Sequence, residues 1–166
     1  MSDAPRGGRI RLPLLDRLLD ADPGAPVDPA VTPHYAVDLL RQAVRRDLET
    51  LLNARRRRLP PPAGLTALAV SPVGYGIPDP TAGSFTEDDR REALAAEVEA
   101  AIRRFEPRLA NVRVTLAKPS RERPDLPDRT LRLRVDAVLR ADPVPEQISF
   151  ETLLRPVTLD VSVRET

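Results

Sequence analysis

Cysteine and histidine, two side chains that often perform catalysis or bind metals, are almost absent from this sequence. The chain has 166 residues, no cysteine and one histidine, His34, so thiol catalysis, thiolate zinc sites and multi-histidine metal sites are excluded. No nucleophile-elbow motif accompanies His34, and no glycine-rich phosphate loop is present. The 25 acidic residues would supply a fitting carboxylate pair by chance alone. We therefore predict a protein that is not an enzyme and that uses no cofactor or metal.

Arginines offer a second kind of chemistry, the binding of phosphates. The run Arg55 to Arg58 is joined by four arginines expected on the outer face of a sheet: Arg113, Arg132, Arg134 and Arg140. The formal net charge is only +1, and two Tyr and three Phe are the only aromatic residues that could stack on bases. A nucleic-acid-binding module stays the alternative function. The structural alternative places the run in the last turn of a helix, where cations meet the negative end of the helix dipole.

The triplet Glu106-Pro107-Arg108 is the most informative spot. Glu106 falls at the end of a predicted helix, where the dipole disfavours an anion, and Arg108 follows across a rigid proline. An anion in that position needs a cationic partner. Either Glu106 pairs with Arg108 or a nearby arginine of the same chain, or the acid and the base face outward and pair with reciprocal charges on another subunit.

Hydrophobic periodicity predicts the elements that position this triplet. Apolar residues at helical spacing predict one helix over about 35–57 and a second that Ser84 or Thr86 caps and Pro107 ends. The period then changes to two, which predicts four strands joined by turns, among them 119–128. The inward residues expected of the strands are Val112, Val114, Leu116, Leu131, Leu133, Val135, Ala137, Leu139, Ile148, Phe150, Thr152, Leu154, Val157, Leu159, Val161 and Val163. We predict an α+β fold with both helices on one face of an antiparallel sheet.

Two further segments are expected to have defined roles. The island Leu14 to Leu19 predicts a short helix with one apolar stripe, which either packs on its own domain or docks into a partner's groove. We therefore divide the chain into a flexible N-terminal segment, 1–33, and a single α+β domain, 34–166. In the connection between the helices, Tyr75, Gly76, Pro78 and Asp79 predict a turn held in one shape by an aromatic anchor.

Hydropathy predicts where the protein resides. No apolar run approaches the roughly 20 residues needed to cross a bilayer, and the first residues lack the apolar region of a secretory signal. We expect a cytoplasmic protein.

Several of these pieces together resemble the TssE subunits of type VI secretion baseplates, a GPW family that is similar to a wedge protein of contractile phage tails. The pieces are Leu14-Leu15-Asp16-Arg17-Leu18, the segment from Val44 to Arg56, Tyr75-Gly76-Ile77-Pro78-Asp79, Phe105-Glu106-Pro107-Arg108-Leu109, Leu131-Arg132-Leu133-Arg134-Val135 and Ser149-Phe150-Glu151-Thr152. They occur in the right order and span nearly the whole chain.

The resemblance implies a role in assembly. Such a subunit links the wedge proteins TssF, TssG and TssK to the first ring of sheath proteins TssB and TssC, and a sheet edge accepts sheath strands and templates polymerisation. It implies that Glu106, Pro107 and Arg108 contact the sheath, while we expect Leu14, Leu15, Arg17 and Leu18 to dock onto the wedge. The baseplate is docked at the inner membrane without insertion of this subunit, and no nucleic acid takes part.

Overall fold

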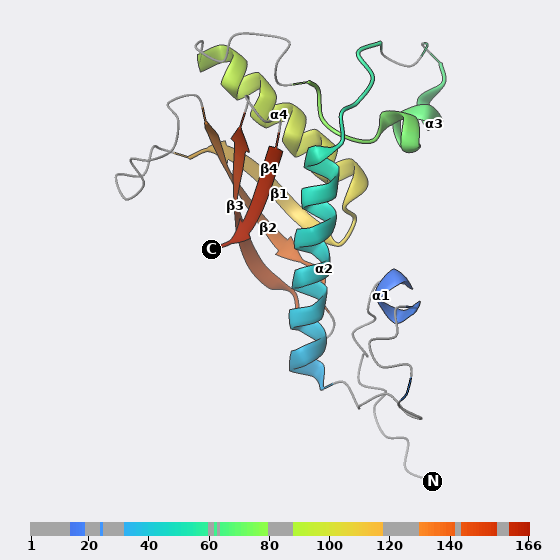
Figure 1. The fold of residues 1–166 in the computed structure, drawn as a ribbon, viewed down its shortest axis with the longest axis vertical. Coiled ribbons are helices and arrows are strands. Elements are labelled where there is room, and N and C mark those ends of the chain that lie inside the picture. The colour runs from blue at the N-terminus through green and yellow to red at the C-terminus, as the bar shows by residue number, and fades with distance from the viewer. Residues whose placement is uncertain are drawn as a thin grey trace.

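The computed structural model describes residues 14–18, 24, 32–59, 62, 64–79, 88–117, 130–141, 144–155 and 160–166. Its elements, in chain order, are α1 (Leu14–Leu18), α2 (Pro33–Asn53), α3 (Thr66–Ala69), the 3-10 turn η1 (Pro72–Gly74), α4 (Asp88–Phe105), β1 (Leu109–Leu116), β2 (Leu131–Leu139), β3 (Glu146–Arg155) and β4 (Asp160–Glu165). Helices come first and strands follow, as Figure 1 shows. The α+β prediction, including a short N-terminal helix, is confirmed.

The four strands form one antiparallel sheet in the order β1-β2-β3-β4. All five predicted inward positions of β2 are buried, and so are Ile148, Phe150, Thr152 and Leu154 of β3, where Leu153 is buried as well. In β4, Val161 and Val163 are buried. The predicted turn 119–128 and the positions Val157 and Leu159 lie outside the described residues.

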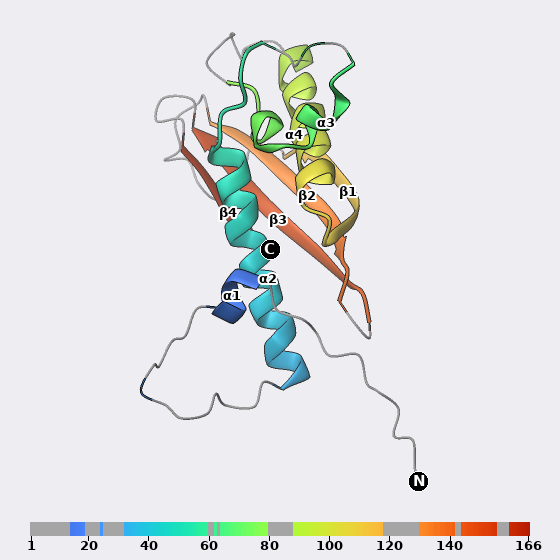
Figure 2. The same cartoon turned by 90° about the vertical axis from the view of Figure 1, so that its right-hand side faces the viewer.

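Both long helices cover the same face of the sheet, and they do so at opposite edges. α2 contacts β4, whereas α4 contacts β1 (Figure 2). Between the helices and the sheet lies one core, in which Phe150, Val135, Ile102 and Val44 are completely buried. The amphipathic pattern explains this arrangement, because each helix has one apolar stripe to remove from water.

The first long helix begins as a capped helix and ends earlier than predicted. Thr32 Oγ1 accepts a hydrogen bond from the Tyr35 amide (3.3 Å). We predicted helix to Arg57, but α2 ends at Asn53 and has no basic residue in its last turn. The Ile77 amide donates to the Ala54 carbonyl (3.0 Å), and this pairing with a distant loop holds Ala54 extended. The prediction that the arginine run lies in the last turn is therefore wrong.

The second long helix agrees with its predicted apolar face. Leu94, Val98, Ala101 and Ile102 are buried and Phe105 packs against the core. The predicted caps, Ser84 and Thr86, lie outside the described residues. α4 ends at Phe105, one residue before Glu106, as the following proline predicts.

The first strand contains an irregularity that the period of two does not predict. Leu109 and Val112 are both buried although three positions apart, and the register with β2 shifts between Ala110 and Arg113. Asn111 has a φ of 51° and takes up the extra residue as a bulge. Beyond the bulge the alternation resumes, so Val114 points into the core and Arg113 points outward.

Candidate functional site

The predicted triplet forms the tight turn between α4 and β1. The Glu106 amide donates to the Ile102 carbonyl (2.8 Å), which closes the last helical turn, and the Leu109 amide donates to the Glu106 carbonyl (3.2 Å). Pro107 lies at the exposed tip of the turn. The helix α4 therefore passes directly into the strand β1, and the backbone of Glu106 and Arg108 is positioned by these two elements.

Glu106 is buried and its partner is Arg108. Only 3% of Glu106 is exposed. Its Oε1 accepts hydrogen bonds from Arg108 Nε (2.6 Å) and from the Arg108 backbone amide (3.2 Å), and its Oε2 accepts from Arg108 Nη2. Of the two alternatives drawn from the sequence, the structure shows the internal pair, and Glu106 does not face outward. A buried anion at a helix C-terminus requires this compensation.

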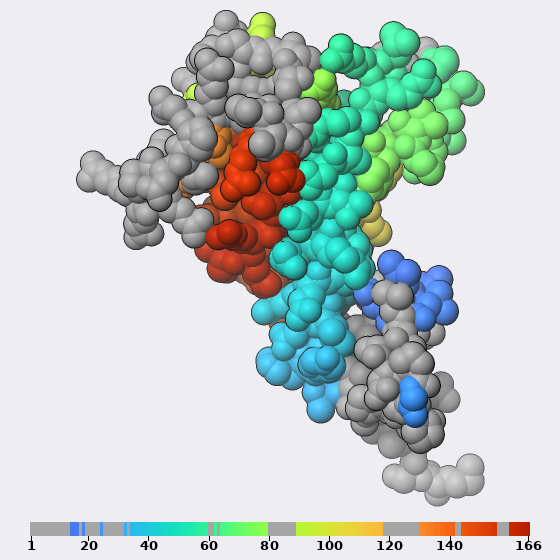
Figure 3. Space-filling view, viewed as in Figure 1, coloured from blue at the N-terminus to red at the C-terminus, as the bar shows by residue number. Residues whose placement is uncertain are grey.

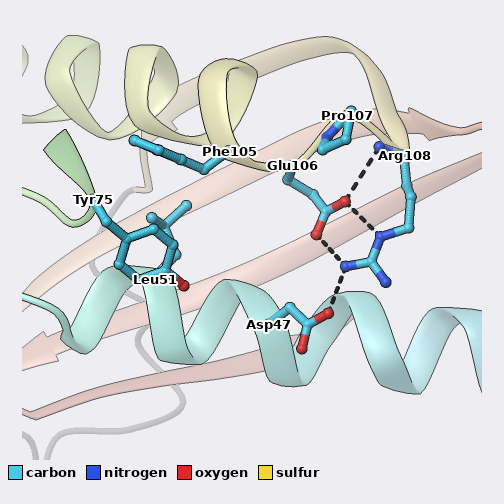
Figure 4. Close-up of a pocket in the computed structure, with 7 residues that line it drawn as sticks. All are labelled: Asp47, Leu51, Tyr75, Phe105, Glu106, Pro107 and Arg108. Atoms are coloured by element: carbon cyan, nitrogen blue, oxygen red, sulfur yellow. Dashed lines mark hydrogen bonds and ion pairs between the residues drawn. The ribbon is translucent and has the colours of Figure 1, made fainter. Parts of the chain in front are cut away.

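Arg108 also reaches a third element. Its Nη2 donates to Asp47 Oδ2 on α2 (2.6 Å), as Figure 4 shows. These bonds to Glu106 and Asp47 raise the pKa of Arg108 further above its usual range, so the guanidinium stays charged. One quarter of the Arg108 side chain is exposed, compared with 4% for Glu106. The cation is therefore the part of this pair that a partner protein can reach.

The ion pairs continue along α2 to α1. Arg46 Nε donates to Asp47 Oδ1 (3.1 Å), and its two terminal nitrogens donate to the two carboxylate oxygens of Asp16 (2.6 and 3.2 Å). The bond from Arg46 lowers the pKa of Asp16. Glu106, Arg108, Asp47, Arg46 and Asp16 thus form a chain of alternating charges, which we call the ion-pair chain. It joins the triplet to the N-terminal helix.

A hollow of about 350 Å³ opens beside the triplet. Its lining combines the charges of Asp47, Glu106 and Arg108 with a mainly apolar set: Leu51, Tyr75, Phe105 and Pro107. The Tyr75 and Phe105 rings meet edge to face with their centroids 5.2 Å apart. Burial, together with the negative charges of Asp47 and Glu106, raises the pKa of Tyr75. This combination of apolar and charged groups offers both packing and ionic contacts to a side chain of another protein.

The predicted loop supplies Tyr75 to this hollow. Gly76 has a φ of 101°, and a Cβ built there would lie 2.4 Å from the Ala54 carbonyl oxygen, so the loop approaches the end of α2 as only glycine allows. Ile77 is fully buried next to it. Asp79 pairs with Arg58 (2.9 Å), and Pro78 lies between these two anchors, partly buried.

α1 is attached by its polar side. Asp16 pairs with Arg46 of α2. The three leucines of α1, in contrast, are exposed to solvent: Leu14 (67% exposed), Leu15 (57%) and Leu18 (72%). Figure 3 shows α1 on the surface beside α2. The Arg17 side chain and Leu19 lie outside the described part. Leu14, Leu15 and Leu18, the described part of the predicted apolar stripe, are thus not packed into the chain's own core.

The arginine run is largely engaged within the chain. Arg55 donates to the Leu52 carbonyl (2.8 Å), Arg56 pairs with Glu97 (2.8 Å), and Arg58 pairs with Asp79. On the outer sheet face, Arg134 pairs with Asp136 (3.0 Å). The ion pairs partly neutralise Arg56, Arg58 and Arg134 for phosphate binding.

Other chemistry finds little support in the described residues. His34 is exposed, and its Nε2 lies 3.7 Å from Asp38 Oδ2. Within the ranges that the structure describes, no group of His, Cys, Asp and Glu could hold a metal ion. Over the same ranges, no helix combines the length and hydropathy of a membrane span.

Sequence reasoning did not predict three members of the ion-pair chain as site residues. Asp16, Arg46 and Asp47 appeared only within segments that carry the family resemblance, and Asp47 is 61 residues away from Arg108. The only signal of Arg46 and Asp47 in the sequence is the adjacent opposite charges on a helix face otherwise rich in arginine. Such a pattern is too common to identify a site.

Comparison with known proteins places this geometry in a family. The family described as "Baseplate wedge protein gp25" matches residues 38–144, which run from the first turns of α2 through β2 and include the hollow and the triplet. α1 and the strands β3 and β4 lie outside the match. Searches of curated proteins and of solved structures gave no match. Because the matched region covers well over half of the chain, this protein belongs to the GPW family of gp25-like baseplate wedge proteins, which are structural parts of phage-tail-like baseplates.

Proposed function

We propose that this protein is the TssE-type subunit of a type VI secretion baseplate, which links the wedge proteins TssF, TssG and TssK to the first ring of the TssB–TssC sheath and templates its polymerisation. It acts as a non-enzymatic assembly protein, in the cytoplasm, within a baseplate docked at the inner membrane. The observation that carries the proposal is the ion-pair chain, because it joins three of the segments on which the family resemblance rests: Asp16 in α1, Arg46 and Asp47 in α2, and the triplet.

The wedge contact is assigned to the N-terminal segment 1–33. α1 presents Leu14, Leu15 and Leu18 to solvent, and three exposed leucines on one short helix form the kind of stripe that enters a hydrophobic groove. Arg17 belongs to the same proposed surface. The Asp16–Arg46 pair holds the helix against α2, so the stripe is presented in a defined direction.

The sheath contact is assigned to the triplet within the domain 34–166. Glu106 sets the position of Arg108, Pro107 forms the exposed tip, and the accessible part of the guanidinium lies at the rim of the hollow. A sheath side chain that enters the hollow would meet apolar side chains together with the Arg108 guanidinium and the carboxylates of Asp47 and Glu106. Glu106 is almost fully buried and acts mainly by positioning Arg108.

Co-purification from the native cytoplasm tests the two contacts separately. Changing Leu15→Gln and Leu18→Gln together alters only exposed side chains, so the fold is expected to persist while recovery of TssF, TssG and TssK falls at least tenfold. The variant Arg108→Met, checked by circular dichroism, is expected to keep the wedge proteins and lose TssB and TssC. Wild-type protein that recovers neither set, or that recovers nucleic acid instead, would contradict the proposal.

A matched control distinguishes the apolar stripe from exposed hydrophobic residues in general. Val70 and Val144 are about as exposed as the α1 leucines but lie far from them in sequence. Val70→Gln with Val144→Gln should leave both sets of partners unchanged. Loss of the wedge proteins in this control would show that the α1 assignment is wrong.

A further inference from the structure

The two edges of the sheet are closed in different ways. At β4, Asn53 at the end of α2 bonds both main-chain groups of one residue: the Val161 amide donates to Asn53 Oδ1 and Asn53 Nδ2 donates to the Val161 carbonyl, both at 2.9 Å. Arg45 donates to the Val163 carbonyl (3.5 Å). The side-chain amide reproduces the pair of bonds that a neighbouring strand would make. α2 packs along the same strand, so this edge is closed by part of the core.

At β1 the edge is held by two charged side chains of α4. The Val114 amide donates to Glu99 Oε2 (2.9 Å), and Arg103 Nη2 donates to the Val112 carbonyl (2.7 Å). The Ala117 amide bonds to the Arg132 carbonyl of β2 (3.0 Å). Because ladder bonds alternate along a strand, the main-chain groups of Val112 and Val114 face away from β2.

A groove runs beside this edge. It has a volume of about 390 Å³, and α4 lines it with three alanines and three charged residues, Glu92, Glu99 and Arg103. The small residues in the lining are Ala95, Ala96 and Ala100. The opposite wall is the edge itself, formed by Val114, Thr115 and Leu116. An extended segment placed here would find outward amide and carbonyl groups on one side and room for side chains on the other.

We propose that the outer edge of β1 receives an extended strand of the sheath and that Glu99 and Arg103 form a releasable clasp, which covers this edge in the free subunit. The inference rests on the proposed function, which supplies TssB–TssC as the partner, and adds the edge and the residues that control access to it. The edge of β4 stays closed.

The clasp is suited to opening because its two charges satisfy each other. Glu99 Oε1 and Arg103 Nη2 already lie 2.8 Å apart as an i, i+4 pair. Arg103 is 59% exposed and Glu99 22%. When an incoming strand takes over the bonds to Val112 and Val114, the displaced Glu99 carboxylate and Arg103 guanidinium stay paired with each other and become hydrated. At β4, by contrast, an incoming strand would have to displace α2 as well as the Asn53 side chain, because α2 packs along this strand.

Binding of purified TssB–TssC to the purified full-length chain tests this inference. Glu99→Ala with Arg103→Ala removes the competitor for the β1 edge, and we expect binding about tenfold tighter. Asn53→Ala is the matched control, because it removes the side chain that bonds the β4 edge while α2 stays packed along that strand, so binding should be unchanged. Val114→Pro removes the amide that the incoming strand needs and should weaken binding at least tenfold, since proline is tolerated where an edge amide faces outward.

The outcomes separate the two proposals. If wild-type chain does not bind TssB–TssC, the proposed function fails. If wild type binds but the clasp variant binds no tighter, or if Asn53→Ala tightens binding instead, the assignment to β1 is overturned while the sheath role stands. Should Val114→Pro not fold, hydrogen exchange of the wild-type complex decides: protection of the Val114 amide is expected, and protection of the Val161 amide alone would contradict the inference.

Discussion

Substitution of Arg108 by methionine tests whether the ion pair with Glu106 stabilises the fold. Methionine keeps much of the apolar stem but removes the guanidinium, so the Glu106 carboxylate, 4% exposed, retains only the bond from the backbone amide of residue 108. Removing one partner of a buried pair destabilises proteins by about 3–5 kcal/mol, and the partial exposure of Arg108 favours the lower end, about 3 kcal/mol. For a chain of this size the melting temperature should fall by about 6–12 °C.

A double-mutant cycle separates the pair from other effects of the substitution. Glu106→Gln removes the charge with little change of shape and leaves Arg108 its bond to Asp47, so we expect a loss of about 1.5 kcal/mol. The double variant carries no buried unpaired charge and should be less destabilised than the sum of the single losses by about 2 kcal/mol. Urea unfolding at pH 7, followed by circular dichroism, measures all four proteins.

Arg113→Met is the matched control, because Arg113 is an exposed arginine on the neighbouring strand β1. It should change the free energy of unfolding by less than about 0.5 kcal/mol. Additive single losses, or an Arg108→Met variant within about 0.5 kcal/mol of wild type, would refute the reasoning that Glu106 depends on Arg108 for its burial.

Two other predictions follow from the loop and from α1. Gly76→Ala should destabilise the protein by about 3 kcal/mol in thermal unfolding, because the positive φ of Gly76 is combined with a clash between the new Cβ and the Ala54 backbone. Gly64→Ala is the control: Gly64 has a φ of +92° but open space around it, so the loss should be about 1 kcal/mol. Equal losses would show that the clash at Gly76 is relieved. Because the hydrogen bond from Arg46 lowers the pKa of Asp16, the attachment of α1 should persist at neutral pH and be lost only as the pH falls below about 4. A spin label can be attached to the Leu18→Cys variant, because the chain has no other cysteine. At pH 7 the label should be ordered in this variant and mobile once Asp16→Asn is added. A label that is equally mobile in the two variants would contradict the role of the Asp16–Arg46 pair.

The regular elements were predictable because each carries its own periodic signal. The spacing of Leu94, Val98 and Ile102 identified the buried face of α4, and the alternation from Leu131 to Leu139 identified the buried face of β2. Helices followed by closely spaced strands then leave an antiparallel sheet covered on one face as the simplest way to bury all these stripes.

Predictions failed where a distant segment decides the local conformation. α2 stops at Asn53 because Ile77 binds Ala54 from another part of the chain, and no property of residues 54–57 signals that contact. The bulge at Asn111 likewise depends on the register between β1 and β2, which the local hydrophobic pattern does not reveal.

For the candidate site, the sequence by itself determined that Glu106 needs a cation, since the helix end and the proline are both local features. Only the tertiary structure decided that Arg108 supplies it, that Asp47 completes the contact, and that Asp16 extends the ion pairs to α1. The same holds for the edges of the sheet, which Asn53 and Glu99 cover from different helices. Periodicity follows from neighbours along the chain, whereas the pairing of charges and of strand edges depends on which elements the core brings together.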